Sequence, residues 1–395
     1  MTINLVKLHE TPMEELQNRA NELGLNLGSK RRSELVYAIA RVEGEQQNQQ
    51  LGRGVLEVHS EGFGFLRAVE QNFLPGPGDI YVSQSQIRRF RLQTGDTIIG
   101  VVRPPKEGER YTALLRVESV NGDPPGVDPP AFESLTAIYP DDRIQLGTEP
   151  SLQALDLVAP LGLGQRAILV APPRTGRADL LQRLTTALST DDDLEVSVLL
   201  IGERPEEIHE WKKNTDLEVI ATAFDDQPSR HLQVADIVFE RARRMVERGD
   251  DVVIVIDSLA RLFRAALTEP MSGSRNGSEG DIAALHRVRR HLGSARALEE
   301  GGSLTVLGVV SCHRTSPTGV TLLDDLEEVV NWEVHLSRDL ADRGISPAIE
   351  VSRSGTLRSE RLLDNNEMKK RKAWRESLTG DSLEDATSLL GMIDQ

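Results

Sequence analysis

Beyond residue 150, short and almost wholly apolar runs alternate with amphipathic helical segments. The runs are AILVA, VSVLLIG, VVIVID and SLTVLGVVS. Strands that are apolar along their whole length are typical of parallel sheets buried on both faces, and parallel neighbours need a helical crossover between them. This order therefore predicts an α/β core with a mostly parallel sheet, in which ligands bind at the carboxyl ends of the strands.

The first of these runs leads into a glycine-containing turn and a helix, in the stretch VAPPRTGRADLLQRL at residues 170–184. Such a loop faces nucleotide phosphates with backbone N–H groups, and it needs a lysine for the outer phosphates and a hydroxyl for Mg²⁺. Arg177 and Ala178 stand at these two positions. Arginine is a bulkier and less compact cation than lysine, and alanine has no oxygen for the metal. The predicted nucleotide-binding residues are Pro172, Pro173, Arg174, Thr175, Gly176, Arg177 and Ala178.

Two acidic residues follow apolar runs of the predicted core. Asp257 comes after VVIVI, where a carboxylate would organise Mg²⁺, and Glu203 comes after LLIG. From the residues alone, a helix cap and an exposed turn acid explain these two positions equally well.

The first 120 residues have a different pattern. In the stretch TPME, Thr11 is predicted as a helix N-cap, with Pro12 at the first helical position. From Gly52 to Val120, short alternating strands with turn residues between them predict a small five-stranded barrel. The predicted organisation is a helical unit over 1–47, the barrel over 51–120, a proline-rich linker over 121–149, the α/β core over 150–365 and a helical tail over 366–395.

Composition limits the possible partners and compartments. The net charge is −16, yet residues 1–120 hold 15 basic and 15 acidic residues, so a polyanion could approach this neutral part but would not be drawn to the whole molecule. The lone Cys312 excludes an internal disulfide and a multi-cysteine metal site. No apolar run approaches the roughly 20 residues needed to cross a bilayer, and the N-terminus lacks the order of a signal peptide. We expect a cytoplasmic protein with no membrane partner.

The stretch GFGF places Phe63 and Phe65 on one face of a strand, because side chains two residues apart point the same way. Tyr81 and Tyr111 can join this face. The cations expected around it are Arg67, Arg88, Arg89 and Arg110. This composition is typical of a platform on which the bases of single-stranded nucleic acid stack. Packing of the same aromatic rings inside the barrel is the alternative, and spacing alone does not decide between the two.

The stretches GVLEVHSEGFGFLRAV, DIYVSQSQIRRF, TGDT and RPPKEGERYTALLRV closely resemble the RNA-binding domain of the bacterial transcription termination factor Rho family. The similarity continues in the family's order through VAPPRTG, GERPEE, SRHLQVAD, IDSLARL, ALHRVRRHLGSARALEEGGSLT, VHLSR and RSGT. It implies an OB or cold-shock-like barrel, a RecA-like core with a P-loop, and ATP with Mg²⁺ as ligands. The RNA-binding residues that it implies are Phe63, Phe65, Arg67, Asp79, Tyr81, Arg88, Glu109, Arg110 and Tyr111, with a preference for pyrimidine-rich RNA.

In the core, the resemblance places Glu203 at the position of the family's catalytic glutamate and matches Arg204, with Asp257 as the Mg²⁺ carboxylate. Gly202 replaces the family's usual acidic residue. Rings of this family complete each ATP site with arginines from the neighbouring subunit. Those positions hold Gly344 and Leu357 here, and Ser346 replaces the aromatic residue on which adenine stacks. Arg343 and Arg358 lie one residue away, although adjacent side chains in a strand point to opposite faces.

The elements that line the family's central pore also differ. Residues 272–285 are polar and retain only Arg275 where the family has a lysine-containing loop, and residues 312–332 carry acids that make a poor lining for an RNA tunnel. The basic run from Lys369 to Lys372 is predicted to lie on a solvated helix face.

Three functional hypotheses follow from these features. The favoured one is a Rho-like protein that binds RNA and forms a homo-hexamer, or a mixed ring with an active Rho, but has weak or no ATP-driven translocation. The second is a working RNA-dependent ATPase and helicase in which Arg177, Arg343 and Arg358 take over the missing roles. The third is a nucleotide-binding scaffold that regulates an active Rho. RNA polymerase is a further expected partner.

Overall fold

The structure is a computed structural model that describes residues 5–25, 32–268, 277–311 and 317–393. Arg275 and Cys312 lie outside these ranges. The chain divides into two compact units, residues 1–132 with 233–247 and residues 133–232 with 248–395. Among the described helices, none combines the length and the apolar character needed to span a bilayer.

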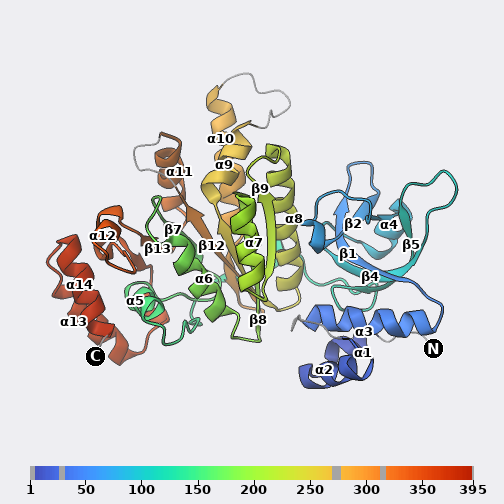
Figure 1. Cartoon of the computed structure of the whole chain (residues 1–395), viewed down its shortest axis with the longest axis horizontal. Coiled ribbons are helices and arrows are strands. Elements are labelled where there is room, and N and C mark those ends of the chain that lie inside the picture. Colours follow the sequence, from blue (N-terminus) through green and yellow to red (C-terminus); the bar gives the residue numbers. More distant parts are fainter. Residues whose placement is uncertain (1–4, 26–31, 269–276, 312–316, 394–395) are drawn as a thin grey trace. The chain divides into compact units, whose positions relative to one another are not determined.

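The chain starts with a small helical bundle (Figure 1). Its helices are α1 (Leu5–Glu10), α2 (Met13–Glu22) and α3 (Arg32–Gln46). They bury Leu16, Leu35 and Ile39 against one another. The prediction for the start of α2 was wrong, because Pro12 rather than Thr11 is the N-cap. The Thr11 hydroxyl instead donates to the carbonyl oxygen of Lys7 at 2.7 Å, near the end of α1.

A closed five-stranded barrel follows, which confirms the prediction from the alternating pattern. Its strands pair in the order β1 (Leu51–Val58), β2 (Gly64–Arg67), β3 (Ile80–Val82), β5 (Thr112–Val120) and β4 (Thr97–Arg103). The short helix α4 (Gln84–Phe90) begins with a capping box formed by Ser83 and Gln86. The core of the barrel is aliphatic and consists of Leu56, Leu66, Ile80, Val82, Ile87, Leu92, Ile98, Val102, Leu114 and Val117.

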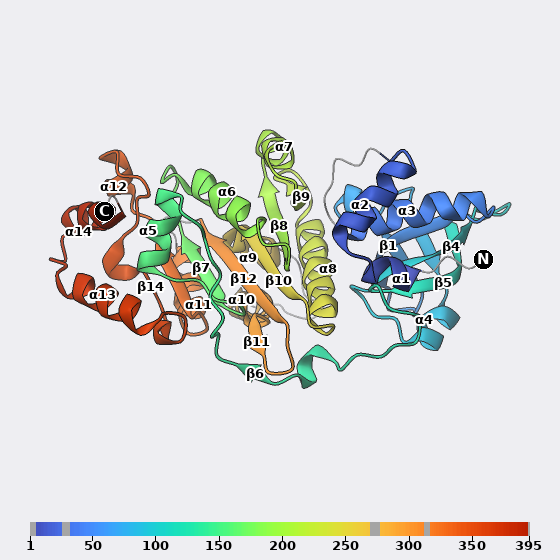
Figure 2. The same cartoon turned by 90° about the horizontal axis from the view of Figure 1, so that it is seen from below.

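The second unit is built on a mostly parallel sheet, again as predicted (Figures 1 and 2). Its strand order is β14 (Gly355–Thr356), β13 (Trp332–His335), β7 (Arg166–Val170), β12 (Ser303–Val310), β10 (Asp251–Asp257), β8 (Leu194–Glu203) and β9 (Glu218–Ala223). At the N-terminal end of β12, β11 (Arg296–Leu298) pairs antiparallel with β12 and also with β6 (Ala137–Ile138). The strand β6 lies in the segment that was expected to be a linker.

Helices cover both faces of this sheet. Leu307 and Val309 of β12 pack in one cluster with Leu181 of α6, whereas a Cβ at Gly308 would lie 2.2 Å from Cδ1 of Leu259 in α9. Because neighbouring strand residues face opposite sides, α6 and α9 lie on opposite faces of the sheet. The helices of this unit are α5 (Pro150–Val158), α6 (Arg177–Leu188), α7 (Pro205–Asn214), α8 (Pro228–Val246, shared with the first unit), α9 (Leu259–Thr268), α10 (Gly277–Gly293), α11 (Pro317–Glu327), α12 (Arg338–Asp342), α13 (Asn365–Glu376) and α14 (Ser382–Ile393).

The carboxyl ends of the central strands meet at one edge. In the parallel ladders, Asp257 of β10 is paired with Leu200 of β8 and with Val309 of β12, and Val310 is paired with Val170 of β7. The loop after β7, Glu203 at the end of β8 and Asp257 at the end of β10 are therefore neighbours. Trp374 of α13 packs in the same core cluster as this sheet.

Candidate functional site

Five aromatic rings gather beside β2 and β3 of the barrel. They belong to His59, Phe63, Phe65, Tyr81 and Tyr111. His59 stacks on Phe63 with ring centroids 5.0 Å apart, and Phe65 contacts Tyr111 edge to face at 4.8 Å. All five side chains are partly exposed, and none belongs to the aliphatic core of the barrel. The structure therefore rules out the alternative that these rings fill the barrel, and it leaves them as one continuous surface, which we call the ring cluster.

Arg67 lies beneath the ring cluster and not around it. Its side chain is buried, with 3% of the residue exposed, and its guanidinium donates to Glu57 (Nε to Oε2, 2.7 Å) and to Asp79. Asp79 is 2% exposed. The guanidinium carbon of Arg67 lies 5.0 Å from the centroid of Phe65. The expectation that Arg67 supplies positive charge around the rings is thus corrected: two carboxylates compensate its charge, and it supports Phe65 from behind.

A cavity of about 560 Å³ opens next to Tyr81 and Tyr111. It brings together four predicted residues, namely Tyr81, Glu109, Arg110 and Tyr111, with Arg103 as a further lining residue. Arg103 donates to Glu109 (Nη2 to Oε1, 2.8 Å). This hydrogen bond, with one from the backbone of Lys106, lowers the pKa of Glu109 to about 2. Glu109 is therefore a carboxylate at neutral pH and presents acceptors beside two aromatic rings.

The remaining predicted cations have different places. Arg110 is exposed, and its guanidinium carbon lies 5.4 Å from the ring centroid of Tyr111. Arg88 and Arg89 are exposed on α4 and do not line the cavity, and Arg89 lies over Phe90. Of the expected cations, Arg110 is the one that the structure brings to the cavity.

Sequence reasoning missed two contributors to this surface. His59 joins the rings because a tight turn, in which the N–H of His59 donates to the carbonyl of Phe63 at 2.8 Å, brings its imidazole back over Phe63. Arg103 reaches Glu109 across the turn PPKEG. The only sequence signal for the second pair is the opposite charge at the two ends of that turn.

The loop between β7 and α6 has the expected shape. Thr175 is buried and its hydroxyl donates to the carbonyl of Pro172 at 2.8 Å, while Gly176 has a φ of +77° and precedes α6 as its N-cap. A positive φ there favours glycine. Arg338 donates to the carbonyls of Pro173 and Arg174 at 3.2 and 3.3 Å, so this partly exposed arginine, missed from the sequence, fixes the outside of the loop.

Arg177 does not point into an open phosphate site. Its Nε lies 3.1 Å from Oδ2 of Asp257, and its Nη2 lies 3.9 Å from Oε2 of Glu203. Glu203 is held further by Arg261, which donates to both carboxylate oxygens, at 3.2 Å from Nη2 to Oε1. Both acids are buried. The sequence-predicted Arg177, Glu203 and Asp257 therefore form one cluster with Arg261, which the sequence had not singled out.

The two acids of this cluster differ in electrostatics. Burial raises the pKa of Asp257, and the charges of Arg177 and Arg261 only partly oppose this effect. Burial also raises the pKa of Glu203, but the hydrogen bond and charge of Arg261, with help from Arg177, outweigh it and leave the pKa below its ordinary value. Glu203 is thus an ionised and cation-paired carboxylate. As a base toward a water molecule, it is weaker than an unpaired carboxylate in the same place.

The residues present do not fit a Mg²⁺ ion. Asp257 is the one carboxylate at the expected place, and its Oδ2 already faces the Arg177 guanidinium. Its Oδ1 is buried without a hydrogen-bond partner among the described residues. Ala178 offers no oxygen. The backbone of the loop therefore remains available to phosphates.

Arg204 and Gly202 lie on the other side of Glu203. Arg204 is exposed and lines a hollow of about 760 Å³ together with Gly202, His231, Arg261 and others. A Cβ at Gly202 would be in ordinary contact with Arg261 and His231, at 3.6 and 3.7 Å, although the φ of +58° disfavours any other residue. Without an acid at position 202, the hollow is lined by Arg204, Arg261 and Arg264 and by the acids Glu206 and Asp226.

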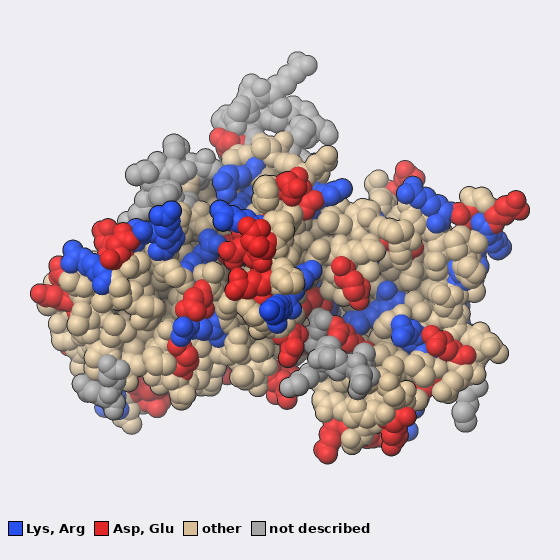
Figure 3. All heavy atoms as spheres, in the orientation of Figure 1, with Lys and Arg blue, Asp and Glu red and all other residues tan. Residues whose placement is uncertain are grey.

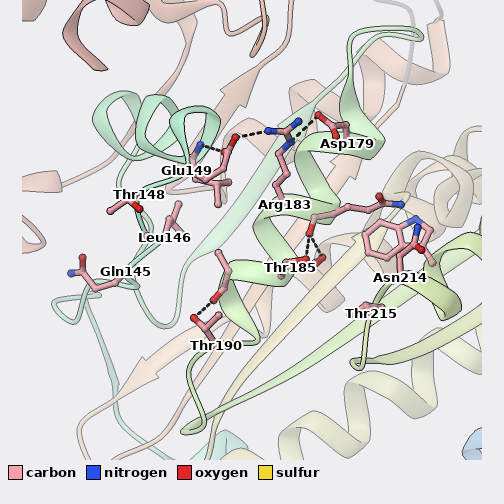
Figure 4. Close-up of a pocket in the computed structure, with 16 residues that line it drawn as sticks. Gln145, Leu146, Thr148, Glu149, Asp179, Arg183, Thr185, Thr190, Asn214 and Thr215 are labelled. Carbon is pink, nitrogen blue, oxygen red and sulfur yellow. Dashed lines mark hydrogen bonds and ion pairs between the residues drawn. The ribbon is translucent and has the colours of Figure 1, made fainter. Parts of the chain in front are cut away.

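A separate cavity of about 680 Å³ lies along α6, away from Glu203 and Asp257 (Figure 4). Arg183 crosses its mouth, donating to Asp179 at 2.9 Å and to Glu149, the N-cap of α5. The hydroxyl of Thr185 donates to the carbonyl of Leu181 in α6, and that of Thr190, just after α6, donates to the carbonyl of Ala187. These polar side chains of the lining are therefore already engaged within the chain.

The segment expected to contact a neighbouring subunit lacks strand geometry. Leu357 is 64% exposed and follows β14, and Arg358 has a φ of +57° with its guanidinium carbon 3.8 Å from the ring centroid of Tyr139. Arg343 and Gly344 form the turn after α12. The argument that neighbouring side chains point to opposite faces of a strand was wrong for both pairs, because neither lies in a strand. Ser346 is exposed in the loop that follows.

Acidic residues at the end of α11 are partly neutralised. Arg289 of α10 contacts Asp325 and Glu328 at 3.2 and 3.1 Å.

Basic and acidic side chains of the described residues are interspersed over the face shown in Figure 3. This distribution agrees with a polyanion contact that depends on local features rather than on the net charge.

Comparisons with known proteins cover both units. Residues 52–126 match the family described as Rho termination factor, RNA-binding domain, and residues 151–356 match the ATP synthase alpha/beta family, nucleotide-binding domain. Proteins named transcription termination factor Rho are 41% identical in Pseudomonas aeruginosa, 44% in Haemophilus influenzae and 43% in Escherichia coli K12. Each of these alignments covers 93% of this chain and 90% of the relative.

Solved structures are similar at lower identity. An ATPase from the type III secretion system of pathogenic bacteria is 19% identical with a TM-score of 0.55, over 74% of this chain and 88% of that one. The assembled ATPase EscN of enteropathogenic E. coli is 19% identical with a TM-score of 0.53, over 74% of each chain. At this identity the likeness shows the fold alone: an OB-like barrel is followed by a RecA-like ATPase core.

Proposed function

Because the chain belongs to the Rho family of transcription termination factors, we propose that it binds single-stranded RNA through its barrel and has weak or no ATP-driven translocation. The ring cluster and the cavity lined by Glu109, Arg110 and Arg103 support the proposed binding of RNA. Partly exposed rings offer stacking to bases, and a carboxylate beside them offers acceptors to the exocyclic amino group of a pyrimidine such as cytosine.

The pairing of Arg177 with Asp257 and Glu203 is the main observation in support of weak or absent ATP-driven translocation. A triphosphate would have to draw the Arg177 guanidinium away from two buried carboxylates, and each would then lose part of its compensating charge. Ala178 supplies no metal ligand, and Leu357 stands where the family places an arginine from the next subunit. The loss of such an arginine alone slows turnover by about 10³- to 10⁵-fold.

A strand-displacement assay tests this function. The full chain is loaded on RNA with a cytidine-rich 5′ segment that is paired downstream to a labelled DNA strand, and ATP is added. We expect tight RNA binding and no ATP-dependent release of the DNA. The double variant R177K/A178T is the matched gain-of-function control for the loop. Release of the DNA by the wild type, at a rate that depends on ATP, would contradict the proposal.

The second hypothesis, a working motor with substituted arginines, has less support. Arg358 lies over Tyr139 of its own chain, and Arg177 faces its own acids. The third hypothesis, a nucleotide-binding scaffold, is supported by the loop backbone, whose N–H groups can still bind phosphates. Tight ATP binding without hydrolysis, measured by calorimetry on the full chain, would favour that scaffold over a protein that has lost the nucleotide.

We further propose that the chain assembles as a homo-hexameric ring, or in a mixed ring with an active Rho, and acts in the cytoplasm on RNA made by RNA polymerase. This assembly rests on family membership. Native mass spectrometry with and without oligocytidine tests it, and mixing with an active Rho tests the mixed ring. A monomer at micromolar concentration in both conditions would contradict the ring.

A further inference from the structure

The basic run of α13 is not uniformly solvated, contrary to the prediction for Lys369 to Lys372. The three lysines are exposed, but Arg371 turns inward and is 7% exposed. Its Nη2 donates to the carbonyl of Val158, the last residue of α5. Its Nε and Nη1 are buried and have no hydrogen-bond partner in the part of the chain that the structure describes. Buried donors without an acceptor are rare in native proteins, so Nε and Nη1 are an exception that calls for an acceptor from outside the described residues.

Arg371 lines a cavity of about 460 Å³ that Gly355 and Thr356 of β14 also line. Lys372 and Arg375 line the same cavity, with the hydroxyl-bearing Thr356 and Ser359 at its other wall. Its one acidic lining residue is Glu376, whose Oε1 lies 3.9 Å from Nζ of Lys372. The lining thus carries three cations and one anion. Two of these positive charges have no counterpart among the lining residues.

Neighbouring groups of the same chain do not provide the missing acceptor. Arg375 donates to the carbonyls of Val158 and Ser354, at 2.9 and 2.8 Å, so it adds positive charge and takes up backbone acceptors. Asp156 and Glu367 are both held by Arg143. Burial, with the nearby charge of Arg375, lowers the pKa of Arg371 to about 10, so that it remains a cation at neutral pH. The carbonyl of Val158 at the end of α5 is an acceptor for Nη2, but no described group is an acceptor for Nε or Nη1.

We propose that this cavity binds a terminal phosphate group, as a phosphomonoester or as inorganic phosphate, with the guanidinium of Arg371 as donor and Lys372 at the rim. The fork of a guanidinium matches two oxygens of a phosphate. A terminal phosphate carries close to two negative charges at neutral pH and therefore balances the lining, whereas each phosphodiester of a nucleic acid carries one. Ser359 also lines the cavity, as does Thr356, whose hydroxyl donates to the carbonyl of Pro160 at 2.7 Å.

The test is isothermal titration calorimetry of the full-length protein with two probes, inorganic phosphate and glycerol 3-phosphate, and with glycerol as the neutral control. K372M removes a charge from an exposed rim residue without touching the packing. K369M is the matched control, because Lys369 is exposed on the same helix but does not line the cavity. We expect K372M to weaken phosphate binding at least fivefold, R371M to abolish it, and K369M to change it less than twofold.

The outcomes separate the sources. Equal affinity for the two probes assigns the site to free phosphate, and tighter binding of glycerol 3-phosphate assigns it to a phosphomonoester. If R371M fails to fold, K372M decides alone. The proposal is overturned if the wild type binds neither probe at millimolar concentration, if K372M and K369M behave alike, or if oligocytidine displaces the bound phosphate.

Discussion

Replacing Arg67 with methionine should destabilise the barrel by several kcal/mol, although the change keeps most of the side-chain volume. Arg67 is almost completely buried and donates to both Glu57 and Asp79. Without it, the carboxylate of Asp79 is left in the interior with one hydrogen bond, from the backbone N–H of Gly76 at 2.8 Å. Removal of one partner from a buried pair typically costs about 3–5 kcal/mol, against a total domain stability of about 5–15 kcal/mol.

Hydrogen exchange of the full chain, followed by mass spectrometry, measures this loss strand by strand. A loss of about 3–5 kcal/mol predicts amide exchange roughly 10²- to 10⁴-fold faster in β1, β2 and β3. Arg91→Met is the matched control, because Arg91 pairs with Asp128 on the surface and should change stability by less than about 1 kcal/mol. Adding Asp79→Leu to Arg67→Met should recover part of the loss, since it removes the stranded charge. Unchanged exchange in Arg67→Met would refute this argument.

Three further predictions concern single side chains. Phe65→Ala should lower the affinity for oligocytidine by roughly 5- to 150-fold, because a stacked base contributes about 1–3 kcal/mol, and fluorescence anisotropy that shows no change in a folded variant would contradict this. The lowered pKa of Glu109 means that the stability contributed by its pairing with Arg103 is complete above pH about 4.5 and is lost as the pH falls from there toward about 2, where the carboxylate of the folded protein is protonated. A ¹³C-carboxyl titration, assigned with Glu109→Gln, should therefore not show a midpoint near 4.5. Gly308→Val should lower the melting temperature of the core, since the new Cβ would meet Leu259 at 2.2 Å and overpacking costs about 1–3 kcal/mol; a melting temperature equal to the wild type's would count against that packing.

Much of the fold could be predicted from the periodicity of the chain. The apolar runs of β7, β8, β10 and β12 predict a parallel sheet because their residues are buried on both faces. The edge at which Glu203 and Asp257 meet follows from the same rule. What periodicity could not show is the segment around β6, since a two-residue strand beside prolines has no repeating pattern.

The sites were harder to predict, because their geometry depends on partners far along the chain. Strand alternation correctly groups Phe65 with Arg67, but it does not show that Asp79, twelve residues later, draws Arg67 inward. Similarly, the sequence places Arg177 in the loop, yet the direction of its guanidinium depends on Asp257, which the sheet order brings to the same edge. Charge compensation over such distances is a property of the folded chain.

The turnover of ATP in the presence of oligocytidine tests the central claim most directly. This claim is that the pairing of Arg177 with Asp257 and Glu203 prevents rapid ATP hydrolysis at the nucleotide site. The wild type should release phosphate no faster than Glu203→Gln, and at least about 10³-fold below the 1–10³ s⁻¹ that is typical of enzymes. Turnover of about 1 s⁻¹ or more that is stimulated by oligocytidine and lost in Glu203→Gln would contradict it.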